Sequence, residues 1–309
     1  MDPLLPLGGS IIIEVVRLLL VFFLMAAARA AAPGDAFLGR WDLTVTQGDT
    51  QYASWLEVTR ANDGQLAARM VGRSGSVRPV EVRLEGDELV FETYRGRVAG
   101  GKLQGTATDR QGRTLQWTGA KVVRPPAPKG EPRWGRPVKL FNGHDLAGWT
   151  FRTPRGKECW TVENSAIVNR PPCPDLLTEQ KFRDFKLHIE HNLDEKSNSG
   201  VYLRGRYEVQ IADTGPRDLD SHGVGGVYGF LTPKVRAAKP AGEWQAFDIT
   251  LAGYQVTVQL NGTTIIDKEE IPGITGAALD SHEAEPGPLM LQGDHGRVQF
   301  RNVVITPAR

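Results

Sequence analysis

One stretch of sixteen residues, 198–213, alternates apolar and polar side chains in two successive runs. Its sequence is NSGVYLRGRYEVQIAD, and Gly205 separates the two runs. Alternation with a period of two is typical of β-strands that pack one face against a core. The other face would carry Arg204, Glu208 and Gln210 in place of the Thr, Ser and Lys of a solvated sheet. Two interpretations fit this face: an acid–base or sugar-binding floor, or an exposed cross-strand ion pair.

The rest of the chain also favours short strands. It contains 35 Gly and 20 Pro and shows no long helical periodicity, which indicates many strands joined by turns. A length of 309 residues predicts about two domains. The formal net charge of +1 gives no electrostatic reason to expect binding to nucleic acid or to an anionic membrane. We therefore predict an all-β protein that does not bind nucleic acid.

The first 30 residues have the pattern of a secretory signal. The apolar run LLLVFFLMAA follows Arg17 and precedes the small-residue sequence ARA, which predicts cleavage near Ala30. A retained membrane anchor is the alternative, but ten strongly apolar residues are short for a span of about twenty. We therefore expect no stable membrane anchor and a periplasmic or secreted protein.

Two domains are predicted after the signal. Residues 36–122 alternate in short runs separated by turn sequences, which predicts a small antiparallel meander closed into a barrel or sandwich, without an evident catalytic cluster. Residues 123–137 contain five prolines and are predicted to be a linker. The second domain spans residues 138–309. Within it, export would allow Cys159 and Cys173 to form a disulfide, with two buried free thiols as the alternative.

Residues 138–309 contain the motifs LFNGHDLAGW, DFKLHIEHNL, NSGVYLRGRYEVQIAD, GGVYGF, KPAGEWQAFDI, LNG and GPLMLQGDHGRVQFRNVVI, in this order. With them this segment resembles the 3-keto-disaccharide hydrolase family, also described as 3-keto-glucoside lyases and hydratases. The resemblance implies a concanavalin-like jelly-roll β-sandwich with the site on its concave sheet. Glu208, Gln210 and Asp213 also resemble the ExDxxE strand of laminarinases, in which a bulge brings the last acid onto the face of the first. Gln210 stands in place of the middle Asp and Asp213 in place of the last Glu, and these two departures argue against retaining hydrolysis by two carboxyl groups.

The family resemblance implies elimination chemistry. A ketone at C3 acidifies the C2 proton, so a base can form an enolate that expels the C1 substituent, and water can then add to the product. This chemistry needs a base near C2, a donor to the C3 oxygen and an acid for the leaving oxygen, and no cofactor is firmly predicted. The candidate catalytic residues are Glu190, Glu208, Asp213 and His295. The candidate substrate-binding residues are Arg204, Gln210, Tyr228, Trp244, Gln292 and Asp294.

Glu190 and Glu208 are expected to face one cavity, with at least one of them as the base. Each lies opposite the apolar residues of its own strand, so packing of those apolar sides into one core would bring both carboxyl groups out together. The pKa of the base would then be raised by burial or by the second carboxylate, and Arg204 would limit the rise. The apolar residues are Leu187 and Ile189 for Glu190, and Val209 and Ile211 for Glu208.

Two alternatives remain open at this point. A divalent metal held by His188, Glu190 and His295 is one, although the order HxEH on a strand excludes a helical zinc motif and no metal site is firmly predicted. The other is a non-catalytic, lectin-like carbohydrate-binding module, which would need the aromatic side chains but not the set of acids and bases.

Overall fold

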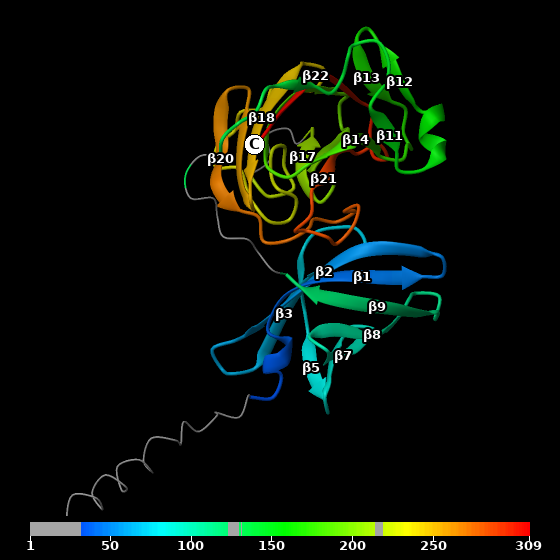
Figure 1. Cartoon of the computed structure of the whole chain (residues 1–309), viewed down its shortest axis with the longest axis vertical. Helices are drawn as coiled ribbons and strands as arrows, with labels where there is room; N and C mark the ends of the chain where they lie inside the picture. The colour runs from blue at the N-terminus through cyan, green and yellow to red at the C-terminus, as the bar shows by residue number, and fades with distance from the viewer. Residues whose placement is uncertain (1–31, 123–129, 131, 214–218) are drawn as a thin grey trace, which may run out of the picture. The chain divides into compact units, whose positions relative to one another are not determined.

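Nine antiparallel strands between Gly39 and Lys121 form one nearly closed sheet, called here the barrel (Figure 1). The computed structural model describes residues 32–122, 130, 132–213 and 219–309. A 3₁₀ helix, η1 (Asp35–Phe37), precedes the strands, whose order across the sheet is β4-β3-β2-β1-β9-β8-β7-β6-β5. Their bounds are β1 (Gly39–Gln47), β2 (Thr50–Arg60), β3 (Leu66–Val71), β4 (Arg78–Val80), β5 (Val82–Glu85), β6 (Glu88–Phe91), β7 (Tyr94–Ala99), β8 (Lys102–Thr108) and β9 (Thr114–Lys121).

The alternation of the sequence directs one face of the barrel strands inward. Trp41, Leu43 and Val45 on β1 are buried and belong to one cluster with Trp117 of β9. The Trp41 indole N–H donates to the carbonyl of Phe37 at 2.7 Å, so its polar end is satisfied inside the apolar core. The predicted small antiparallel barrel is confirmed.

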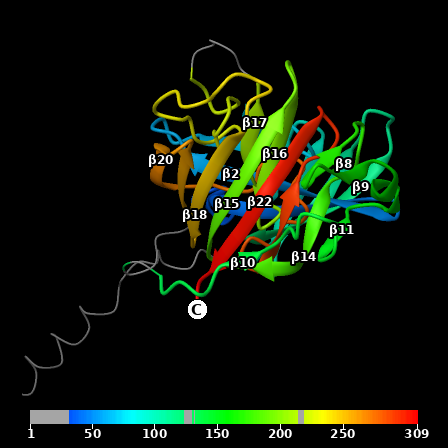
Figure 2. The same ribbon diagram turned by 90° about the horizontal axis from the view of Figure 1, so that it is seen from above.

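The remaining strands form two antiparallel sheets, called here the sandwich (Figure 2). A 3₁₀ helix, η2 (Pro154–Glu158), lies between β11 and β12 in the chain. The eight-stranded sheet contains β12 (Trp160–Glu163), β13 (Ala166–Asn169), β22 (Val298–Pro307), β15 (Phe185–Leu193), β18 (Gln245–Ala252), β19 (Gln255–Leu260) and β20 (Thr263–Glu270) in this order, with β10 (Val138–Lys139) paired to β22. The five-stranded sheet contains, in order, β11 (Trp149–Phe151), β14 (Leu176–Phe182), β21 (Gly287–Leu291), β16 (Asn198–Leu203) and β17 (Tyr207–Ala212).

The two sheets of the sandwich share one hydrophobic core. Leu187 and Ile189 enter it from β15, and Val209 and Ile211 enter it from β17. Both strands therefore point their apolar residues inward as their sequences predict, but from opposite layers. The all-β, jelly-roll class predicted for this half of the chain is confirmed.

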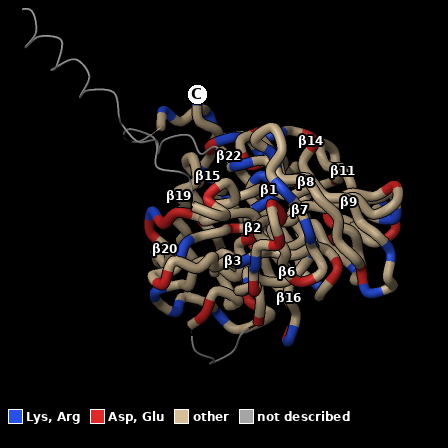
Figure 3. The backbone as a smooth tube through the Cα atoms, turned by 90° about the horizontal axis from the view of Figure 1, so that it is seen from below, with Lys and Arg blue, Asp and Glu red and all other residues tan. Residues whose placement is uncertain are grey.

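Residues Phe37–Arg309 form one compact unit. Within the larger unit the sandwich core also includes Ala53, Trp55 and Val71 of the barrel strands β2 and β3. The predicted signal, residues 1–30, lies outside the described residues, as does much of the predicted linker. In the described part of the chain, no helix has the length and apolar character needed to cross a membrane. Basic and acidic residues are both scattered over the backbone, so neither sign of charge gathers on one side in this view (Figure 3).

Candidate active site

Glu208 lies on the outer face of the five-stranded sheet, while its neighbours on β17 point into the core. The register of the β16–β17 hairpin pairs Glu208 with Tyr202 and Gln210 with Gly200. Gly200 is required here, because a Cβ at this position would overlap Oε1 of Glu208. The hairpin thus places a carboxyl group that is only 4% exposed beside a tyrosine and an amide.

Two side chains hydrogen-bond to the Glu208 carboxyl group. The Tyr202 hydroxyl lies 2.9 Å from Oε2 and also 3.0 Å from the carbonyl oxygen of Gly276. The surroundings of the Gln210 amide assign its orientation, in which Nε2 donates to Oε1 of Glu208 at 3.2 Å. A tyrosine hydroxyl has one proton and cannot donate to two acceptors at once. When Glu208 is protonated it can donate to Tyr202, which then donates to Gly276, so that every group has a partner.

Burial raises the pKa of Glu208 to about 8. The hydrogen bond from Tyr202 opposes this rise in pKa, and the negative charges of Asp175 and Asp294 add to it. Burial and the neighbouring Glu208 likewise raise the pKa of Tyr202 above its ordinary value. Glu208 can therefore hold a proton at neutral pH and release it near pH 8, while Tyr202 stays neutral.

Glu208 lines a small cavity of about 80 Å³ together with residues from several loops. Tyr228 contributes a hydroxyl whose pKa is raised by burial and by Glu208. Gln292 is buried, and its Oε1 atom has no hydrogen-bond partner among the described residues. His295 is half exposed, and its Nδ1 atom lies 2.5 Å from Oδ1 of Asp294. The lining residues are Ser74, Gly75, Asn198, Tyr202, Glu208, Gln210, Tyr228, Gly276, Ala277, Gln292 and His295.

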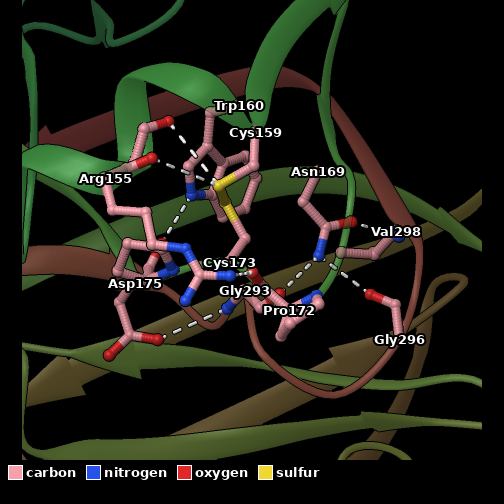
Figure 4. The surroundings of a disulfide bond; sticks show 12 residues. Arg155, Cys159, Trp160, Asn169, Pro172, Cys173, Asp175, Gly293, Gly296 and Val298 are labelled. Atoms are coloured by element: carbon pink, nitrogen blue, oxygen red, sulfur yellow. Dashed lines mark hydrogen bonds between the residues drawn. A yellow bond between two sulfur atoms is a disulfide. The ribbon is translucent and has the colours of Figure 1, made fainter.

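The loop that carries His295 is held at both ends by Asn169 (Figure 4). The fully buried Asn169 amide donates to the carbonyls of Gly293 and Gly296 at 2.9 and 2.8 Å, and its oxygen accepts from the Val298 amide at 2.7 Å. Asp175 accepts from the Gly293 amide at 3.3 Å. These bonds fix the backbone on either side of His295.

A disulfide joins Cys159 to Cys173 beside this loop (Figure 4). The amide of Cys173 donates to the Gly293 carbonyl at 3.2 Å, so the bridged segment contacts the loop directly. Asp175, two residues further on, pairs with Arg152 at 2.8 Å, and burial raises the pKa of Asp175. The disulfide therefore supports the wall of the cavity that carries His295.

The expectation that Glu190 and Glu208 face a common cavity is wrong. Glu190 lies on β15 in the eight-stranded sheet, whereas Glu208 lies on β17 in the five-stranded sheet. Both strands direct their apolar sides into the same core, so their polar sides emerge on opposite surfaces of the sandwich. Glu190 accepts hydrogen bonds from Arg301 and Asn302, at 2.7 and 2.6 Å, and these lower its pKa despite partial burial.

Arg204 does not lie on the polar face with Glu208. It occupies the turn after β16 with a positive φ of 56°, where the strand alternation has ended. Its guanidinium pairs with Asp184 at 2.8 Å and donates to the carbonyl of Gly253 at 2.8 Å, so it joins loops and leaves the pKa of Glu208 untouched. β17 pairs with β16 in regular register as far as Ala212, so there is no bulge that would place Asp213 on the same face as Glu208. Asp213 instead accepts a hydrogen bond from the Lys196 amide.

Trp244 also lies away from the cavity that Glu208 lines. The Arg301 guanidinium covers its ring at 3.9 Å, next to Glu190. The three residues considered as metal ligands, His188, Glu190 and His295, do not come together. Nε2 of His188 lies 3.9 Å from Oε1 of Glu190 on the eight-stranded sheet, whereas His295 lines the cavity beside Glu208. Among the described residues, no group of three or more His, Cys, Asp or Glu side chains is placed to hold a metal ion.

Tyr202 and Asn169 were not among the predicted site residues. Tyr202 could have been found from its position directly across the hairpin from Glu208, since cross-strand partners follow from the turn between two alternating runs. Asn169 offers no comparable signal, because its three contacts all come from residues more than 120 positions away in the chain.

Comparison with known proteins gives a family and several similar structures. The model of the 3-keto-alpha-glucoside-1,2-lyase-like domain matches residues 136–306. A candidate glycosyl hydrolase from Parabacteroides distasonis is 26% identical, with 60% of this chain and 93% of that chain covered and a TM-score of 0.48. A second one from the same organism is 23% identical, with 56% and 94% covered and a TM-score of 0.47. A carbohydrate-binding module from Bacillus subtilis is 14% identical, with 50% and 93% covered and a TM-score of 0.36.

No curated protein matches the chain. The family model spans more than half of the chain and covers the cavity residues of the sandwich, from Asn198 to His295. The chain therefore belongs to the family of 3-keto-alpha-glucoside-1,2-lyase-like domains.

Proposed function

We propose that this protein cleaves 3-keto glycosides by elimination and that Glu208 accepts the C2 proton. The observation that carries the proposal is the buried Glu208 carboxyl group, with a pKa of about 8, lining a cavity with His295 in a chain of this family. The carboxylate form is a stronger base than an ordinary glutamate and is populated to about a tenth at pH 7.

Different residues of the cavity can carry out the successive steps of the elimination. The Glu208 carboxylate takes the proton from C2, and the electron pair forms an enolate with the C3 carbonyl. Collapse of the enolate forms the C1–C2 double bond and breaks the bond from C1 to the leaving oxygen, which takes a proton from His295. Tyr228 and Gln292 supply polar groups for the sugar oxygens. Addition of water across the new double bond, with hydroxyl to C1 and a proton to C2, completes a net hydrolysis.

Glu208→Gln tests the assignment, because it keeps the shape of the side chain and removes the base. We expect kcat/KM on a 3-keto glucoside to fall roughly 10²- to 10⁴-fold. Glu190→Gln is the matched control on the opposite sheet and should change the rate little. In deuterated water the wild type should exchange or lose the C2 proton, and the glutamine variant should not.

The pH profile separates a base from an acid. On a 3-keto glucoside with a nitrophenolate leaving group, which needs no proton from His295, kcat/KM should rise with pH up to about pH 8 and then level off if Glu208 is the base, since its carboxylate form is the active one. A rate on this substrate that does not rise toward pH 8 would exclude Glu208 as the base. An equal loss of kcat/KM in Glu208→Gln and Glu190→Gln would refute the assignment of Glu208 as the base. Binding of a glycan without formation of any product would favour a lectin-like module.

Export is part of the same proposal. The apolar run that ends near Ala30 supports it, as does the disulfide between Cys159 and Cys173. Sequencing the N-terminus of the mature protein from a fractionated culture tests export, and an intact N-terminus on a protein found only inside the cell would contradict it.

A further inference from the structure

The cavity beside Glu208 is not built by the sandwich alone. Two of its lining residues, Ser74 and Gly75, belong to the loop between β3 and β4 of the barrel, residues 72–77. They lie in the chain far from the other lining residues, which all come from residues 198–295. The barrel, predicted as an accessory domain without a catalytic cluster, therefore forms part of the wall of the candidate site.

The β3–β4 loop is seated tightly against two sandwich loops that also line the cavity. The Arg73 carbonyl accepts a hydrogen bond from the Ala277 amide at 3.0 Å. At Gly276 a Cβ would overlap the carbonyl oxygen of Gly75, so only glycine lets the two backbones approach this closely. At Gly229, next to the cavity residue Tyr228, a Cβ would lie 2.9 Å from Oγ of Ser76. The position of this wall is thus fixed by contacts on both sides of the cavity.

Further contacts between the barrel and the sandwich, apolar packing among them, also hold the β3–β4 loop in this position. Trp55 of β2 is fully buried in the sandwich core, and its ring meets Phe230 edge-on, with centroids 5.7 Å apart. A Cβ at Gly273 would overlap this indole. Thr44 of β1 hydrogen-bonds to Ser281 at 2.7 Å. Buried tryptophan and glycine-dependent contacts are features of a permanent interface, and a tethered domain would need neither.

The size of the cavity indicates what the wall does. About 80 Å³ is well below the roughly 300–1,000 Å³ of most small-molecule sites. A whole sugar ring does not fit in this volume, but one edge of a ring does. With Glu208 and His295 in the lining, the edge that enters is the one that carries the reacting atoms, and the rest of the glycoside stays outside.

We infer that the β3–β4 loop is the specificity-determining wall of the site and limits entry to one edge of a single keto-sugar ring. The inference rests on the proposed function for the identity of the sugar, but the geometry of the wall can be tested without turnover. Larger side chains on the loop should close the cavity, whereas changes elsewhere on the barrel should not.

Ser74→Trp is the test, with Asp87→Trp, in the turn between β5 and β6, as the control for a new exposed tryptophan. We expect Ser74→Trp to lower kcat/KM on methyl 3-keto-glucoside roughly tenfold or more, since misplacement by about 1 Å can cost 10²-fold. The Asp87→Trp control should retain the wild-type rate, and both variants should unfold at the wild-type temperature because residues 74 and 87 are exposed.

Chemical modification gives a second measurement that needs no substrate. Diethyl pyrocarbonate should modify His295 several-fold more slowly in Ser74→Trp than in the Asp87→Trp control, while the exposed His282 reacts equally in all proteins. Equal rates at His295 in all variants would overturn the inference even if the enzyme cleaves keto sugars. A wild type without activity on keto sugars, but with His295 shielded by Ser74→Trp, would overturn the proposed function and support the wall.

Discussion

A buried histidine on β15 should make the stability of this protein depend on pH. His191 is fully buried and stacks on Phe247, with ring centroids 4.7 Å apart. Neither ring nitrogen has a hydrogen-bond partner among the described residues. Burial lowers the pKa of His191 from 6.5 to about 3, because the imidazolium form would lose its hydration without gaining a partner.

The sign and size of the effect follow from the two pKa values. Because the folded-state pKa is below the unfolded one, the unfolded chain binds a proton first as the pH falls. The contribution is therefore fully present above about pH 6.5 and is lost as the pH falls from there toward 3. Between pH 7 and pH 5 the free energy of unfolding should decrease by about 2 kcal/mol through this one group.

His191→Leu removes the titrating group and keeps an apolar side chain of similar volume. Urea unfolding at pH 7 and pH 5 gives the free energy of unfolding of both proteins, and the contributions of all other groups cancel in the comparison. The wild type should lose about 2 kcal/mol more than the variant. Equal losses, or an NMR titration showing that His191 gains its proton near pH 6.5 in the folded protein, would refute the reasoning.

Two further predictions concern the packing around the site. Gly200→Ala should displace the Glu208 carboxyl group from Tyr202, because the added Cβ would overlap that carboxyl group. We expect steady-state kinetics to show a roughly 10- to 100-fold lower kcat/KM and a pH profile shifted away from pH 8. An unchanged rate and pH profile would contradict this prediction. Loss of the bond between Cys159 and Cys173 should cost about 2–4 kcal/mol in urea unfolding with and without reductant. Two free thiols counted in denatured, unreduced protein would show that the bond does not form.

The sequence predicts which side of a strand is buried, because alternation is a local property. Leu187 and Ile189 on one strand, and Val209 and Ile211 on another, all point into the core as expected. The same pattern does not say to which of two sheets a strand belongs, since the inner faces of both layers are apolar. The error over Glu190 has this origin.

The candidate site depends on information that local patterns lack. Arg204 follows the alternation of its strand in the sequence, but it lies one residue past the end of β16, where the backbone turns. The approach of Ser74 to Glu208 depends on how the barrel packs on the sandwich, which neither segment encodes alone. Alternation predicted Glu208 and Gln210 as candidates, the family resemblance added Tyr228, Gln292 and His295, and the structure brings these five together.

The pairing of Tyr202 with Glu208 across the hairpin restricts where related chains can carry insertions and deletions. A single residue inserted into or deleted from β16 or β17 would shift all later side chains of that strand to the opposite face. A deletion in β17 before Glu208, for example, would direct Glu208 into the hydrophobic core and place Val209 in the cavity instead. Insertions and deletions should therefore be excluded from residues 198–212 in active relatives and should accumulate in segments that do not set this register.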